Sequence, residues 1–132
     1  MLLYRRAMLR VADRIRTSTY HDAVVTGDAV SQVASQTLSN LAAVYEASRS
    51  LLLSPLAGQC KAETVALAQR IGTYEISIRP GADCCGLLVA KHPQTKSDAA
   101  ELRELESGYD LDALADAAVA ARESHEFASP VA

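Results

Sequence analysis

The chain has 132 residues, enough for one domain with a hydrophobic core. No apolar run approaches the ~20 residues that a membrane-spanning helix requires, and the opening Met-Leu-Leu-Tyr-Arg-Arg lacks the order of a secretory signal. We therefore expect a cytoplasmic protein with no membrane partner. The three cysteines, two of them adjacent, do not form a secreted disulfide framework, and the absence of Cys-x-x-Cys gives little support for a metal site.

Charge is distributed unevenly along the chain. Residues 1–96 carry eleven Lys and Arg against seven Asp and Glu, a balance of +4. Residues 97–132 carry two against nine, a balance of −7. A mildly basic body could contact a polyanion, whereas an acidic end is more often a solvated face.

Residues 2–16 have the pattern of an amphipathic helix, with apolar side chains every three or four residues. The pattern places Arg6, Arg10 and Asp13 on the solvent side. Arg5 lies at the edge of the apolar stripe, where its aliphatic stem can pack while its guanidinium reaches a neighbour. On this pattern alone, most of the arginines would serve only to keep the helix soluble.

A strand, a glycine and a helix are predicted next. Residues 23–26 are an apolar run typical of a buried parallel strand, Gly27 ends it, and residues 29–41 have a helical pattern with Gln36 on its polar side. Ligands of open α/β sheets lie beyond the carboxyl ends of the strands, and a glycine without Cβ lets a nucleotide approach the backbone. Spacing alone, however, favours an ordinary strand–turn–helix unit.

The remaining sequence predicts further strands and helices. We expect a loop at 42–50, a strand candidate at 51–56 that Pro55 stops, and a helix at 61–71 capped by Gly72. A strand or extended segment follows near 76–79. Ser97 and Asp98 are candidate caps of a helix that runs to about 106, and a last helix covers 110–121. The predicted fold class is α/β, a short parallel sheet flanked by helices.

Cys84 and Cys85 precede Gly86 in a predicted loop. A thiol there can be exposed. Lys91 and His92 could favour the thiolate if the loop folds back, whereas Asp83 would oppose it. From the residues alone, the first interpretation is that both cysteines are small buried hydrophobic groups.

Several strings of the sequence together resemble one family. They are Y-R-R-x-M-L-R-V-A, T-G-D-x-x-x-Q-V-A-S-Q-T-L-x-N-L, A-x-R-I-G-T-Y-E-I-S-I and D-C-C-x-x-x-x-x-K-H-P-x-T-K. They resemble the tRNA 4-thiouridine sulfurtransferases, which also serve thiamine biosynthesis. The resemblance covers roughly residues 2–106. It implies the carboxyl-terminal part of an incomplete, Rossmann-like PP-loop (adenine-nucleotide alpha-hydrolase-like) domain at 1–108, followed by an acidic helical tail at 109–132.

The resemblance also implies roles for individual residues. Arg5, Gly27 and Gln36 would contact ATP, with Mg²⁺ as its usual counter-ion. Gly27 follows Arg5 by 22 residues and Gln36 follows Gly27 by nine, as in the family. Cys85, which precedes a glycine, would be the mechanistic cysteine, with Cys84 as the alternate.

The implied reaction is ATP-dependent sulfur transfer to tRNA. ATP activates the 4-oxygen of a uridine as an adenylate, and a persulfide sulfur displaces that oxygen to give 4-thiouridine. The domain's cysteine attacks the persulfide and forms a disulfide that releases sulfur, which is thiol–disulfide exchange. The implied partners are tRNA and a persulfide donor, either a cysteine desulfurase or a rhodanese-type protein.

One part of the family pattern is missing. The family's nucleotide loop, S-G-G-x-D-S, has no counterpart here, because the sequence contains no Gly-Gly. We therefore expect the chain to need a separate amino-terminal half for transferase activity. Two alternatives stay open: a non-catalytic remnant that binds nucleotide or a partner, and another PP-loop tRNA-modifying enzyme.

Overall fold

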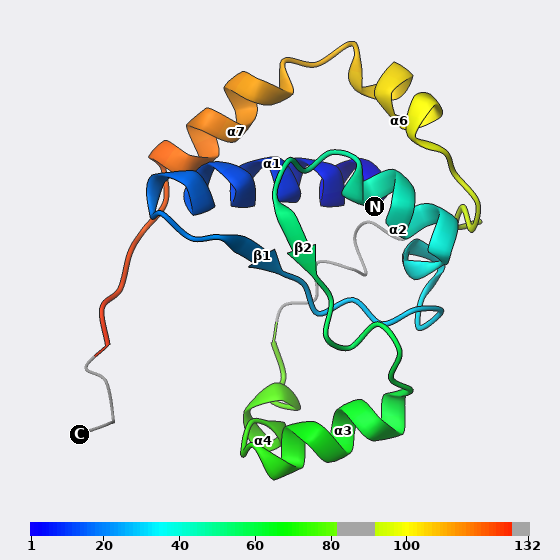
Figure 1. Ribbon diagram of the computed structural model, residues 1–132, viewed down its shortest axis with the longest axis vertical. Helices are drawn as coiled ribbons and strands as arrows, with labels where there is room; N and C mark the ends of the chain where they lie inside the picture. Colours follow the sequence, from blue (N-terminus) through cyan, green and yellow to red (C-terminus); the bar gives the residue numbers. More distant parts are fainter. Residues whose placement is uncertain (82–91, 128–132) are drawn as a thin grey trace.

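The computed structural model of this protein describes residues 1–81 and 92–127. In chain order its elements are α1 (Leu2–Ser18), β1 (Ala23–Val25), the 3₁₀ turn η1 (Ala34–Gln36), α2 (Leu38–Tyr45), β2 (Leu51–Leu53), α3 (Lys61–Arg70), α4 (Tyr74–Ser77), α6 (Ala99–Glu106) and α7 (Leu111–Ala120) (Figure 1). Among these described segments, no helix is long and apolar enough to cross a membrane.

The two strands form a parallel pair. Ala23 lies opposite Leu51, and Val25 lies opposite Leu53. Parallel strands need a crossover, which η1 and α2 provide. Helix α1 lies between β1 and α7 and also contacts α2 and α6 (Figure 1). The fold is therefore α/β, a short parallel sheet flanked by helices, as the sequence predicts.

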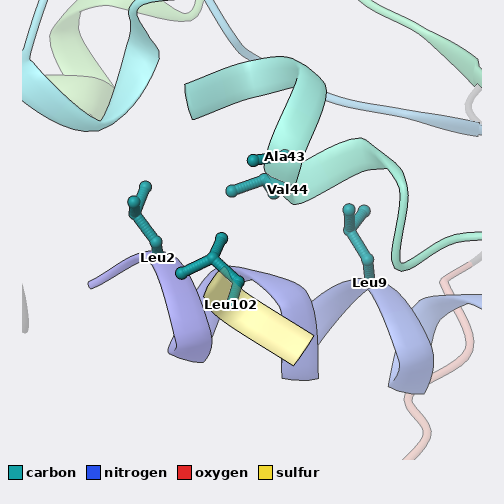
Figure 2. Packing of buried hydrophobic residues seen from close by; sticks show 5 residues of the cluster. All are labelled: Leu2, Leu9, Ala43, Val44 and Leu102. Atoms are coloured by element: carbon teal, nitrogen blue, oxygen red, sulfur yellow. The ribbon is translucent and has the colours of Figure 1, made fainter. Parts of the chain in front are cut away.

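The hydrophobic core lies where three helices meet. Leu2 and Leu9 from α1 pack with Ala43 and Val44 from α2 and with Leu102 from α6 (Figure 2). All five side chains are buried, and Val44 is completely inaccessible. Removing this apolar surface from water holds α1, α2 and α6 together.

The prediction that Arg6 faces solvent is wrong. Arg6 is fully buried, and its guanidinium donates to both carboxylate oxygens of Glu106, at 2.7 and 2.9 Å. It also donates to Glu46 at 3.0 Å and to the carbonyl of Ala43. Arg10 donates to the same Glu106 carboxylate at 2.8 and 3.0 Å. These charge-assisted bonds compensate the cost of burying the ions, and their acidic partners are far away in the sequence.

Asp13 also turns toward the protein rather than away from it. Its Oδ1 accepts from the hydroxyls of Ser48 and Ser50 at 2.7 and 2.5 Å, and Oδ2 accepts from the backbone N–H of Arg49 at 2.8 Å. Asp13 thereby fixes the turn that leads into β2.

The helix predicted over 29–41 is wrong in extent. A turn with Ser31 at a left-handed φ of 65° leads into η1, and α2 occupies Leu38–Tyr45, partly within the loop predicted at 42–50. A left-handed residue cannot continue a right-handed helix. Thr37 then caps α2, because its hydroxyl accepts a backbone N–H from the first turn.

The extended segment predicted near 76–79 is wrong as well. Residues Tyr74–Ser77 form the short helix α4, in which the N–H of Ser77 donates to the carbonyl of Thr73 at 3.0 Å. Helices α3 and α4 pack against each other, away from the core cluster, and neither contains a buried residue (Figure 1).

Two predicted helix ends are confirmed. Gly72 follows α3 at a φ of 76°, a conformation that glycine adopts without a Cβ penalty. Asp98 caps α6, where its carboxylate accepts the backbone N–H of Glu101 at 2.8 Å.

Candidate nucleotide site

A buried carboxylate joins two of the residues that the family resemblance assigns to ATP. Asp28, 4% exposed, directly follows Gly27. Its Oδ1 accepts from Nη2 of Arg5 at 2.5 Å and from Nε2 of Gln36 at 3.1 Å. Its Oδ2 accepts from the hydroxyl of Tyr45 at 2.7 Å. Asp28 therefore gathers side chains from α1, η1 and α2 at one point.

The Arg5 side chain is held at two ends. While Nη2 donates to Asp28, Nη1 donates to the backbone carbonyl of Ser35 at 3.1 Å. The side chain is 17% exposed. The expectation that the Arg5 guanidinium reaches a neighbour from the edge of α1 is thus confirmed.

A cluster of hydroxyl groups supports the carboxylate from the sheet. The hydroxyl of Tyr45 lies 2.7 Å from Oγ of Ser54 and 3.0 Å from Oγ1 of Thr26, and these two oxygens are 2.9 Å apart. Thr26 directly follows β1 and Ser54 directly follows β2. Asp28 therefore lies at the carboxyl ends of the parallel strands, where open α/β sheets bind ligands.

Gly27 leaves its backbone accessible beside this carboxylate. The residue is exposed, and a Cβ added to it would meet no atom of the described chain within 4 Å. Its φ is not in the left-handed region. Neither local conformation nor packing in the described residues requires glycine here, and the backbone of Gly27 is open to approach.

A second buried polar residue fixes the chain next to η1. The Nδ2 of Asn40 donates to the carbonyls of Ala34, at 2.7 Å, and Gln94, at 2.9 Å. Its Oδ1 accepts from the N–H of Ser97 at 2.9 Å. Asn40 thus ties the residues before α6 to the turn that ends in Gln36.

The predicted sulfur site cannot be compared with this geometry. Cys84 and Cys85 lie outside the described residues. Within residues 1–81 and 92–127, no three His, Cys, Asp or Glu side chains gather where they could hold a metal ion.

The sequence interpretation missed Asp28 and Tyr45. Asp28 stands in the T-G-D string directly after the candidate glycine, so its position was a usable signal. Tyr45 gave no such signal, because its segment reads as a loop and its partners are distant in the sequence.

Comparison with known proteins identifies the family. The family model described as thiamine biosynthesis protein (ThiI) matches residues 1–111. The chain belongs to the ThiI family. A probable tRNA sulfurtransferase of Thermus thermophilus is 50% identical over 97 residues, 74% of this chain and 24% of that protein. One of Nocardia farcinica is 44% identical over 115 residues, 87% of this chain and 28% of that protein.

A solved 4-thiouridine synthetase shares this fold over most of the chain. The crystal structure of a 4-thiouridine synthetase–RNA complex with bound ATP matches with a TM-score of 0.85 and 41% identity, over 92% of this chain and 32% of that one. A probable tRNA sulfurtransferase of Lactobacillus delbrueckii subsp. bulgaricus is 41% identical over 91% of this chain and 30% of its own length. This chain therefore spans about 30% of the length of the curated relatives that it matches.

Proposed function

We propose that this chain forms the ATP-binding, carboxyl-side part of a tRNA sulfurtransferase that makes 4-thiouridine. One observation carries the proposal: Arg5 and Gln36 converge on Asp28, beside the accessible backbone of Gly27, at the carboxyl ends of two parallel strands. The likeness to a 4-thiouridine synthetase that was solved with RNA and ATP supports it.

The nucleotide contacts divide among three chemical groups. The Arg5 guanidinium supplies positive charge, Gly27 supplies an unobstructed backbone and Gln36 supplies an amide that can donate and accept. Bound ATP, with Mg²⁺ as its counter-ion, would activate the 4-oxygen of a tRNA uridine. The proposed domain is 1–108, with 109–132 as an acidic helical tail.

In this proposal Cys85 carries out the sulfur chemistry, with Cys84 as the alternate. Its thiolate bonds to the inner sulfur of a persulfide on a cysteine desulfurase or rhodanese-type protein. The sulfur–sulfur bond breaks, the outer sulfur leaves as sulfide and a mixed disulfide remains. The same transfer would supply sulfur for the thiazole of thiamine.

The test combines this chain with the part of a ThiI relative that carries the phosphate loop, supplied as a separate polypeptide. With ATP, a persulfide donor and unmodified tRNA, we expect 4-thiouridine, detected by mass spectrometry of digested tRNA. Cys85→Ser should abolish the product and Cys84→Ser should retain it.

Three results would contradict the proposal. Product formation that survives both cysteine substitutions would remove the sulfur assignment. ATP binding without any product would instead favour a non-catalytic nucleotide-binding remnant, and a different modified base in the digest would identify another PP-loop enzyme.

A further inference from the structure

The Asp28 carboxylate determines which end of the Gln36 amide is available to a ligand. An ionised carboxylate only accepts hydrogen bonds, so Gln36 must present its Nε2 group to Asp28. The carbonyl oxygen Oε1 then lies at the other end of the amide. Among the described residues it accepts no hydrogen bond, which leaves an acceptor for a ligand donor such as an amino or hydroxyl group.

The same carboxylate fixes the plane of the Arg5 guanidinium. One terminal nitrogen donates to Asp28 and the other to the carbonyl of Ser35, so the planar group is held at two points. A long side chain that is ordered before binding loses less rotamer freedom when a ligand arrives.

Asp28 is itself braced from the opposite side. Its second oxygen accepts from Tyr45, whose hydroxyl is tied to Ser54 and Thr26 at the strand ends. The carboxylate is therefore held at the strand ends, and it in turn holds two side chains, one from α1 and one from η1.

We propose that Asp28 is a positioning residue for nucleotide binding, which holds Arg5 and Gln36 in a fixed arrangement beside Gly27. The inference rests on the proposed function, because it takes the nucleotide to contact Arg5 and Gln36. Asp28 acts through these two side chains and does not touch the nucleotide itself.

The first test measures ATP affinity by calorimetry, with this chain assembled with the phosphate-loop polypeptide. Asp28→Asn should weaken ATP binding roughly 5- to 100-fold, the cost of immobilising two long side chains on binding. Asp13→Asn is the matched control, because Asp13 also accepts three hydrogen bonds but contacts neither Arg5 nor Gln36. It should leave ATP affinity within about twofold, the scatter typical of a site without coupling.

A double-mutant cycle separates positioning from direct contact. In a chain that carries Arg5→Ala and Gln36→Ala, Asp28→Asn should have little further effect on ATP affinity. A full effect in that background would show that Asp28 contacts the nucleotide, and tighter binding by Asp28→Asn alone would show that it competes for Arg5. Either result would overturn the proposal.

A second measurement needs no nucleotide. In ¹⁵N NMR relaxation of this chain, the side-chain amide of Gln36 should be rigid. In Asp28→Asn the order parameter of this amide should fall below about 0.6, whereas Asp13→Asn should leave it unchanged. Equal mobility in the unmodified chain and in Asp28→Asn would overturn the positioning role. Failure of the assembled protein to bind ATP would overturn the proposed function instead.

Discussion

Arg6 and Glu106 form the most deeply buried ion pair that the structure describes, since the two side chains are 0% and 7% exposed. Burial of the Glu106 carboxyl raises its pKa, but hydrogen bonds from Arg6 and Arg10, together with their charges, outweigh burial and lower the pKa to about 2. The pair connects α1 to α6 beside the core cluster. It contributes to stability only while both partners are present.

Replacing Glu106 with glutamine should therefore destabilise the protein. Glu106→Gln leaves the buried Arg6 without its main counter-ion and should lower the free energy of unfolding by about 3–5 kcal/mol, measured by urea denaturation. Glu104→Gln on the exposed side of α6 is the control and should change it by less than about 0.5 kcal/mol. Equal effects would show that the pair does not stabilise the fold.

The same pair predicts how stability depends on pH. The ordinary pKa of a glutamate is 4.5 and that of folded Glu106 is about 2, so the unfolded chain takes up a proton first as the pH falls. The stability that Glu106 contributes is fully present above pH 4.5 and decreases between pH 4.5 and 2. Urea denaturation at pH 6 and pH 3 should show this loss, and Glu106→Gln should show a smaller one.

At the residue scale, helical periodicity places Arg5 correctly and Arg6 incorrectly. The helical pattern identifies Arg5 as an edge residue, and the structure agrees. It assigns Arg6 to solvent, because the acidic partner that permits its burial lies 100 residues later. The hydrophobic periodicity of a helix cannot reveal an ion pair between residues that far apart in the sequence.

Among the elements, α2 is joined to two other segments through one buried side chain. Asn40 is fully buried, and its amide joins α2 to the turn before Gln36 and to the chain before α6. Ala34 lies in the 3₁₀ turn η1, whereas Gln94 and Ser97 lie outside regular structure, and Asn40 supplies a hydrogen bond to a backbone group of each.

Asn40→Ala should cost at least about 2 kcal/mol, because it removes three hydrogen bonds and leaves the buried backbone N–H of Ser97 unpaired. Thermal unfolding followed by circular dichroism measures the loss. Ser39→Ala is the matched control on the same helix, since its contacts are long, at 3.4 and 3.5 Å, and it should stay within about 0.5 kcal/mol. A similar loss in both variants would contradict this account of Asn40.

Two helix boundaries follow from the sequence, and the start of α2 does not. Gly72 and Asp98 act through their own or adjacent backbone, and both were predictable. The helix predicted over 29–41 fails because Ser31 adopts a left-handed conformation, which helical periodicity cannot detect, and α2 begins only after its cap Thr37. The strand or extended segment expected near 76–79 has the residue types of a strand but no neighbouring strand in the described chain, and Tyr74–Ser77 forms α4 instead.

The whole molecule is unevenly stabilised. Helices α1, α2 and α6 share the core cluster, whereas α3 and α4 contain no buried residue and contact mainly each other. Segments with little buried apolar surface open at lower free energy than the core.

Native-state hydrogen exchange should reveal this difference. Backbone amides in the middle of α3 should exchange at least about tenfold faster than those of α2, because their local opening exposes little buried surface. Mass spectrometry of deuterated peptides from this chain makes the comparison, with α1 as an internal reference. Equal protection of α2 and α3 would mean that the two parts unfold as one unit.

The overall architecture and part of the candidate site follow from the sequence. The α/β class and the parallel pair are predictable because their apolar runs are local, and the family strings select Arg5, Gly27 and Gln36. Asp28 and Tyr45 belong to a network that forms only when α1, η1 and α2 come together. Such a network requires tertiary geometry.

The hydrogen bond from Tyr45 to Asp28 has a spectroscopic consequence. The chain has five tyrosines and no tryptophan, so phenol rings dominate its near-ultraviolet absorption and emission. Of the tyrosines that the structure describes, Tyr45 is the one whose hydroxyl donates to a carboxylate. A change in the charge around Asp28 would shift the bands of this phenol, so difference spectra against Tyr45→Phe would report on the candidate nucleotide site without any attached dye.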